Sequence, residues 1–255
     1  MSAPAPIRRL DPLVAERPVR VLEAGLGPTI VLVHGLGLDA DVWLYHLPRL
    51  GGAGYRVLAP DMPGFGESPG PAFGFTVDHA AQWLAALADA CDVRSALWVG
   101  HSVAAQHVLR LAAIRPDLAA GVVLAAPTGE TGLFRWAVQL GALVVTAFRE
   151  RPRMVRRAVG RYLTNVPTRA LGSWIASRRH LARDDAPLVR CPVRVVLGER
   201  DPLVPRAFAE RLAATAPDGE LVVIPDSAHG VALVPAEPFC QTVLEFAHRV
   251  FHTGQ

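Results

Sequence analysis

The feature that most constrains the fold of this chain is a serine between a strand-like run and a helix-like segment. The apolar run Ala96–Val99 leads into residues 100–104 (Gly-His-Ser-Val-Ala), and a helical pattern begins directly after Ser102. When a strand turns into a helix through a single residue, that residue takes a strained backbone conformation and its side chain points outward. Gly100 and Ala104 are small enough for strand and helix to approach each other. The segment therefore predicts an exposed serine at a helix start, where free backbone N–H groups point at whatever it attacks.

Short β-branched runs alternate with longer helical patterns, which indicates an α/β fold with a mostly parallel central sheet flanked by helices. The predicted strands are Val19–Leu22, Ile30–Val33, Arg56–Ala59, Ala96–Val99, Gly121–Leu124, Val193–Leu197 and Leu221–Ile224. The predicted helices are Asp41–Leu50, Val77–Cys91, Val103–Ile114, Pro205–Ala214 and Pro238–Phe251. Several of these strands are nearly continuous apolar runs, as expected when helices cover both faces of a parallel sheet.

The alternation stops between Pro127 and Cys191, where only helical patterns occur. They cover Leu133–Phe148, Arg153–Leu163 and Thr168–Leu181. We expect residues 1–127 and 188–255 to form the α/β core and residues 128–187 to form an inserted all-helical cap (lid). Such a cap would cover the edge of the sheet where ligands bind in open α/β folds. It carries eleven arginines against four acidic residues. This excess indicates either a solvated outer face or attraction of an anionic substrate or acidic surface.

Composition excludes several other classes of protein. The net charge is only +3 and no basic stripe with interleaved aromatics occurs, so no nucleic-acid partner is expected. The three cysteines lie far apart, which predicts neither a disulfide framework nor a zinc site. The longest apolar stretch, Trp136–Phe148, is shorter than the ~20 residues of a membrane span. Without a visible signal peptide, we expect a cytoplasmic protein with no integral membrane segment. The oligomeric state is left open.

Four further motifs surround the serine in sequence, each following a predicted strand. They are residues 34–37 (His-Gly-Leu-Gly), 61–68 (Asp-Met-Pro-Gly-Phe-Gly-Glu-Ser), 198–202 (Gly-Glu-Arg-Asp-Pro) and 227–230 (Ser-Ala-His-Gly). A candidate nucleophile, acid and base thus occur in the order Ser102, Asp201, His229. A serine hydroxyl is a poor nucleophile until a base removes its proton, and His229 is the candidate base. Asp201 would hold the imidazole in the required tautomer.

This order of motifs resembles the α/β-hydrolase family over roughly Val19 to Phe246, most closely its lid-bearing esterases, perhydrolase-type haloperoxidases and carbon–carbon bond hydrolases. Ala104 and Ala228 stand where glycine is common in that family. The resemblance implies an α/β-hydrolase fold and an oxyanion hole made by the backbone N–H groups of Leu36 and Val103. It implies no metal and no organic cofactor.

The candidate residues also have alternative interpretations. Ser102 could be an ordinary helix N-cap, and Asp201 could be only a turn former before a proline. Glu130 follows another strand and could supply the acid instead, while Asp226 is a weaker rival because it lies too close to His229 in the same loop.

Other polar and aromatic residues near the motifs admit structural roles. His34 is expected to organise the glycine turn by hydrogen bonding, and Asp61 to tie its own loop together. Trp43, Phe65 and Trp136 are candidate substrate-binding residues, although such aromatics more often belong to the core.

These observations predict a serine hydrolase that cleaves a small-to-medium apolar ester through an acyl-enzyme, with a small apolar acyl compound as its partner. The same residues would serve a thioester, a lactone or a carbon–carbon bond. A non-hydrolytic lyase or cyclase, in which Ser102 only positions the substrate, is a further alternative. A non-catalytic protein that binds a small ligand is the remaining alternative.

Overall fold

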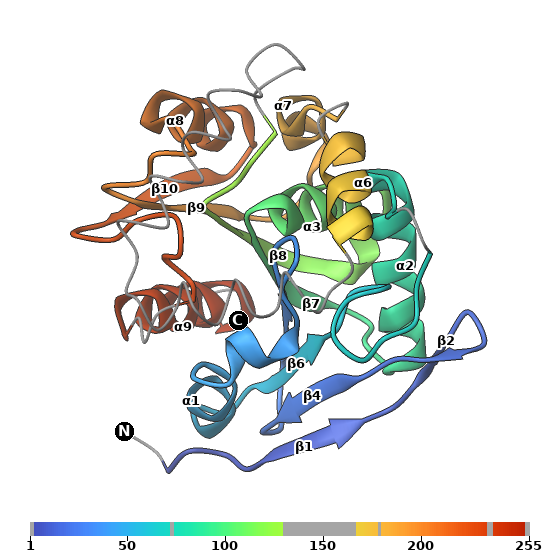
Figure 1. The fold of residues 1–255 in the computed structure, drawn as a ribbon. Coiled ribbons are helices and arrows are strands. Elements are labelled where there is room, and N and C mark those ends of the chain that lie inside the picture. The colour runs from blue at the N-terminus through green and yellow to red at the C-terminus, as the bar shows by residue number, and fades with distance from the viewer. Residues whose placement is uncertain (1–2, 72–73, 130–166, 178–179, 234–236, 253–255) are drawn as a thin grey trace.

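The centre of the molecule is an eight-stranded sheet with the strand order β1-β4-β6-β5-β7-β8-β9-β10 (Figure 1). This computed structural model describes residues 3–71, 74–129, 167–177, 180–233 and 237–252. The strands of the sheet are β1 (Ile7–Leu10), β4 (Val21–Ala24), β5 (Thr29–Val33), β6 (Arg56–Pro60), β7 (Ala96–His101), β8 (Ala119–Ala125), β9 (Val193–Gly198) and β10 (Gly219–Ile224). In the series β6-β5-β7-β8-β9-β10 all neighbouring strands run parallel. Strand β4 runs antiparallel to both of its neighbours, β1 and β6.

Helices cover both faces of the sheet, which confirms the predicted fold class. They are α1 (Leu47–Gly52), α2 (Val77–Ala90), α3 (Val103–Ile114), α8 (Arg206–Thr215) and α9 (Glu237–His252), with the 3-10 turns η1 (Ala40–Trp43) and η2 (Pro116–Leu118) between them. The helices α1 and α9 contact each other on one face, and α2, α3 and α8 cover the other (Figure 1). Every residue of β7 and β9 is buried, as their apolar sequences predict for strands covered on both sides.

The seven strands expected from the sequence are all present, with ends that differ by at most two residues. The structure adds β1 and the small β2 (Leu13–Val14) and β3 (Arg17–Pro18) pair, which were not predicted. The first of these carries Arg8 and Arg9 and is largely exposed, so it lacks the apolar alternation of a half-buried strand. An edge strand gains its hydrogen bonds from one neighbour and needs no buried face of its own.

The prediction of a single helix over Asp41–Leu50 is wrong. The structure has the short η1 turn there, followed by the separate helix α1 with Pro48 in its first turn. Proline has no N–H and clashes with the preceding turn inside a helix, but it is tolerated at a helix start. The proline therefore begins a new helix instead of continuing the old one.

Part of the predicted cap lies within the described residues. It includes α6 (Pro167–Ser177), α7 (Ala182–Asp185) and all but the last residue of the turn η4 (Ala186–Leu188), and both helices contact α3 (Figure 1). The helices expected over Leu133–Phe148 and Arg153–Leu163 lie outside the described residues, so the division into core and cap stays a prediction. Within the described part of the chain, no helix combines the length and apolar character needed to cross a bilayer.

Candidate active site

The loops that carry the predicted motifs gather where the parallel strands end. Pairing of β5 with β7 sets Val33 opposite Gly100, so the glycine-rich loop after β5 lies beside the turn of the serine. Pairing of β9 with β10 sets Gly198 opposite Ile224, which makes the loops of the predicted acid and base neighbours. Because ligands bind at the carboxyl ends of the strands in open α/β folds, this edge is the candidate site.

The turn between β7 and α3 consists of Ser102 alone. Its backbone angles, φ 57° and ψ −119°, lie in a region that residues other than glycine seldom occupy. A Cβ on Gly100 would overlap the carbonyl oxygen of Ala104, so this position requires glycine. Ala104 itself is completely buried, which shows that alanine fits where the resemblance led us to expect glycine. The strained turn that the sequence predicted is therefore present.

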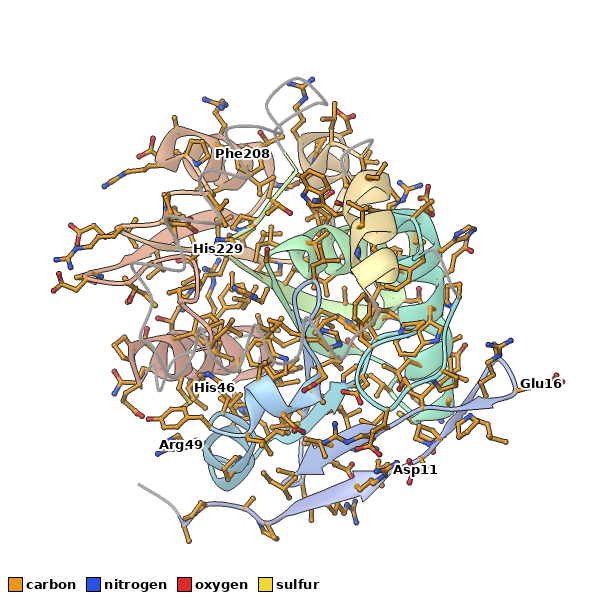
Figure 2. The ribbon with its side chains drawn as sticks, in the orientation of Figure 1. Asp11, Glu16, His46, Arg49, Phe208 and His229 are labelled. Atoms are coloured by element: carbon orange, nitrogen blue, oxygen red, sulfur yellow. The ribbon has the colours of Figure 1, made fainter. Side chains whose placement is uncertain are left out.

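The side chains of Ser102, His229 and Asp201 form one series of hydrogen bonds. His229 Nε2 lies 3.0 Å from Ser102 Oγ, and His229 Nδ1 lies 2.9 Å from Asp201 Oδ2. A carboxylate only accepts, so Nδ1 carries the proton and Nε2 offers its lone pair to the serine hydroxyl. Figure 2 shows His229 in the interior near β9. The geometry matches what a serine and its general base require.

Asp201 is held in place by the turn that follows it. Its side chain is fully buried, and its Oδ1 accepts hydrogen bonds from the backbone N–H groups of Leu203 (2.8 Å) and Val204 (3.1 Å). The turn role considered for this residue and its contact with His229 are therefore compatible, because each uses a different carboxylate oxygen.

The other acids are placed differently. Asp226 is exposed and pairs with Arg200, and its backbone N–H bonds to Glu199. Glu130 lies outside the described residues.

The glycine-rich loop after β5 packs against the turn of the serine. A Cβ on Gly35 would lie 3.4 Å from Ser102 Cβ and 2.9 Å from His101 Nδ1. His34 Nδ1 donates to the carbonyl of Gly35 (2.9 Å), and its Nε2 accepts from the backbone N–H of Met62 (2.9 Å). This confirms that His34 organises the turn.

The oxyanion-hole residues are placed consistently with that role, which stays a prediction. Leu36 follows Gly35 in the same loop and is half-buried. Val103 is the first residue of α3, where backbone N–H groups have no partner within the helix.

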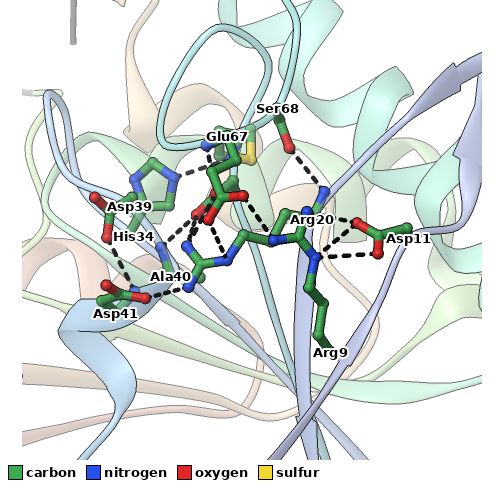
Figure 3. A network of polar contacts seen from close by, with 11 residues as sticks. Arg9, Asp11, Arg20, His34, Asp39, Ala40, Asp41, Glu67 and Ser68 are labelled. Carbon is green, nitrogen blue, oxygen red and sulfur yellow. Dashed lines mark hydrogen bonds and ion pairs between the residues drawn. The ribbon is translucent and has the colours of Figure 1, made fainter. Parts of the chain in front are cut away.

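A network of polar contacts around a buried carboxylate joins this loop to the loop after β6 (Figure 3). The side chain of Asp61 is fully buried and accepts from the backbone N–H groups of Ala40 (2.7 Å) and Glu67 (2.8 Å). The guanidinium of Arg20 contacts Asp61 (3.2 Å), Glu67 (3.3 Å) and Asp41. Asp61 therefore ties its own loop together, as expected, and also fixes the neighbouring loop after β5.

His101 is a residue whose contribution the sequence did not reveal. It is buried, and its Nε2 donates to the backbone carbonyl of His229 (3.1 Å), so it braces the loop that carries the candidate base. Burial, together with the nearby His229, lowers its pKa to about 3, which keeps it neutral. The contact joins residues far apart in the chain, so no local pattern could have indicated it.

The candidate substrate-binding aromatics separate into different surroundings. Trp43 is completely buried and stacks on Phe239 at a centroid distance of 6.4 Å, so the structure places it in the core and gives a binding role no support. Phe65 is almost completely buried between the rings of His34 and Phe75, at 5.9 and 6.2 Å. Trp136 lies outside the described residues. Among the residues that the structure does describe, no cluster of His, Cys, Asp and Glu has the makings of a metal site.

Comparisons with known proteins agree with this fold. The sequence pattern of the alpha/beta hydrolase family matches residues 30–242. The chain is 30% identical over 247 residues to the dihydrolipoyllysine-residue acetyltransferase component of the acetoin cleaving system of Pseudomonas putida, covering 88% of this chain but only 64% of that relative. It is 28% identical over 245 residues to the pimeloyl-[acyl-carrier protein] methyl ester esterase of Edwardsiella ictaluri, covering 86% of this chain and 92% of the esterase.

Solved structures share the same fold. A thermophilic esterase from Thermogutta terrifontis superposes with a TM-score of 0.82 at 23% identity, covering 95% of this chain and 99% of the esterase. The match of the family pattern over most of the sequence, with the strand order and the motif loops described above, leads to one conclusion. The chain is a member of the α/β-hydrolase family.

Proposed function

We propose that this hydrolase cleaves a small-to-medium apolar ester by attack of Ser102, through an acyl-enzyme intermediate. The observation that carries the proposal is the hydrogen-bond series from Ser102 Oγ through His229 to Asp201. The strained turn supports it, because it presents the hydroxyl at the start of α3. Relatives and structural neighbours named as esterases support the class of substrate.

The proposed reaction has two steps. Ser102 Oγ attacks the ester carbonyl carbon while His229 Nε2 takes the hydroxyl proton, and the same nitrogen then protonates the departing alcohol. In the second step a water molecule gives its proton to Nε2 and attacks the acyl-enzyme, which releases the carboxylic acid and restores the serine hydroxyl. Asp201 stabilises the imidazolium that forms in each step.

Two backbone donors would stabilise the negative oxygen of each tetrahedral intermediate. We assign this role to the N–H groups of Leu36 and Val103, since their loops meet at the serine. Loss of one such donor typically lowers turnover by about 10²–10³. Phe65, Trp136 and the helical cap of residues 128–187 would enclose the acyl chain, and the described cap helices lie against α3, which follows the serine.

Fluorophosphonate labelling combined with a series of p-nitrophenyl esters tests the proposal. Wild-type protein should be labelled at Ser102 and should hydrolyse these esters. Ser102→Ala should abolish the label and lower turnover by about 10⁶. Asp201→Asn should lower it by about 10⁴, because the imidazole loses its orienting acceptor.

Several outcomes would contradict parts of this assignment. Activity that survives Ser102→Ala would favour the lyase or cyclase alternative. Damage from Glu130→Gln with an unaffected Asp201→Asn variant would make Glu130 the acid. Preference for thioester or lactone substrates over every p-nitrophenyl ester would revise the substrate class and keep the mechanism.

A further inference from the structure

Two segments that are distant in sequence meet on one buried amide of α3. The side chain of Gln106 is buried, and its Nε2 donates to Thr128 Oγ1 at 2.9 Å. Its Oε1 lies 3.3 Å from Nδ1 of His180. Thr128 lies at the beginning of the proposed cap segment and His180 near its end. A single glutamine side chain therefore holds both ends of that segment.

Charged groups anchor the His180 end of this arrangement. His180 Nε2 lies 2.7 Å from Oδ2 of Asp185, whose side chain is buried in α7. The other oxygen of Asp185 accepts from Arg110 of α3 at 2.9 Å, and Arg110 also bonds to Asp78 of α2 at 2.7 Å. We name Gln106, Thr128, His180, Asp185 and Arg110 the hinge clamp. It connects α7 to α3 and to the loop after β8.

The Thr128 end of the hinge clamp reaches the turn of the candidate nucleophile. The backbone N–H of Thr128 donates to the carbonyl of Ser102 at 3.4 Å, and the carbonyl of Gly129 accepts from the N–H of Ala182 at 3.4 Å. A Cβ on Gly129 would lie 3.0 Å from Gln106 and 3.1 Å from Ala182, and its φ of +119° also favours glycine. The two ends of the segment thus touch each other directly beside the serine.

A buried glutamine at this position needs an explanation. Gln106 follows Ser102 by one helical turn, so both lie on the same side of α3. An apolar side chain of similar size would fill the space without the desolvation cost of an amide. The amide is both donor and acceptor, so it can bridge a hydroxyl and an imidazole at once. Its contacts leave Ser102 Oγ and His229 untouched.

We propose that Gln106, through the hinge clamp, is a positioning residue that holds Thr128 and the α7 region beside the serine and thereby determines how well a long acyl chain binds. The inference rests on the proposed ester hydrolysis and on the cap of residues 128–187. A short acyl chain would end near the serine and would not reach the proposed cap. The hinge clamp should therefore influence KM for long-chain esters and have little influence on kcat for short ones.

Steady-state kinetics with p-nitrophenyl acetate and p-nitrophenyl octanoate test this inference. Gln106→Met removes both hydrogen bonds at similar volume and should raise KM for the octanoate about fivefold or more, with kcat for the acetate within about twofold of wild type. Thr128→Val should act in the same direction, and the double variant should be no worse than the worse single variant. Gln106→Glu keeps an acceptor for His180, so its KM for the octanoate should stay close to that of the wild type. Gln241→Met, the same change at an exposed position of α9, is the control and should change neither constant.

Hydrogen–deuterium exchange gives a readout that does not depend on activity. Peptides covering residues 126–129 and 180–186 should exchange faster in Gln106→Met than in Gln241→Met. If Gln106→Met does not fold, the Thr128→Val variant carries the same comparison. Unchanged KM values for the octanoate, or equal losses for both esters together with a lower Tm, would overturn the inference. Wild-type protein that hydrolyses neither ester and is not labelled at Ser102 would instead refute the proposed function.

Discussion

At the scale of single residues, the serine that the sequence marks out is also the place where the backbone is strained. The backbone of Ser102 lies at φ 57° and ψ −119°, and a side chain in such a region costs of order 1–3 kcal/mol. The fold holds it there because β7 and most of α3, which flank the serine, are buried. Strain that persists in this way indicates a position selected for what its side chain does.

Ser102→Gly should therefore give a more stable protein than Ser102→Ala, although both remove the nucleophile. Glycine adopts this conformation without a Cβ penalty, so we expect the free energy of unfolding to rise by about 1 kcal/mol relative to Ser102→Ala. Both variants should be inactive, and urea denaturation measures the difference between them. Equal stabilities would mean that a Cβ at position 102 adds no strain to the turn.

At the scale of elements, the position of the loop after β5 depends on an ion pair between Asp61 and Arg20, the residue before β4. Arg20 has a side chain only 12% exposed, and its carboxylate partners include the fully buried Asp61. Breaking a buried pair by removing one partner leaves an uncompensated charge, which is strongly destabilising. Arg9 also pairs with Glu67, but its side chain is 48% exposed, and exposed pairs contribute little.

Arg20→Met should accordingly lower the free energy of unfolding by about 3 kcal/mol, and Arg9→Met by less than about 1 kcal/mol. Adding Asp61→Asn to Arg20→Met should recover part of the loss, because the buried charge is then gone. Urea denaturation of the four proteins at neutral pH makes the comparison. Similar small losses for both arginines would show that water already screens the Arg20 site.

The same elements show what sequence could and could not predict. Seven strands were recognised because they are short apolar runs, and the loops of Ser102, Asp201 and His229 follow from where those runs end. The edge strand β1 escaped because pairing with β4, and not its own pattern, makes it a strand. The partners of Gln106 and His101 escaped for a related reason. A hydrogen bond across the fold requires only one donor and one acceptor, which leave no periodic trace in the sequence.

At the scale of the whole molecule, three buried histidines make stability depend on pH. They are His46 before α1, His101 at the end of β7 and His107 in α3, so they lie in separate parts of the core. Burial lowers the pKa of His46 to about 4 and those of His101 and His107 to about 3, from an ordinary value of 6.5. The folded protein therefore keeps these rings neutral at pH values where the unfolded chain protonates them.

The sign of the effect follows from proton binding. Above about pH 6.5 neither state binds the protons and stability is complete, whereas below it the unfolded chain binds more of them and is favoured. Each histidine should then remove up to about 1.4 kcal/mol per pH unit as the pH falls from about 6 towards 4.

His107→Phe replaces one ring, which packs against Phe75, with an apolar ring of similar shape. Its unfolding free energy should fall less steeply with decreasing pH than that of the wild type, and His79→Phe, the same change at an exposed position of α2, is the matched control. Urea denaturation between about pH 7 and 5 measures these slopes. Identical slopes for wild type and His107→Phe would mean that this imidazole gains its proton in the folded state as readily as in the unfolded one.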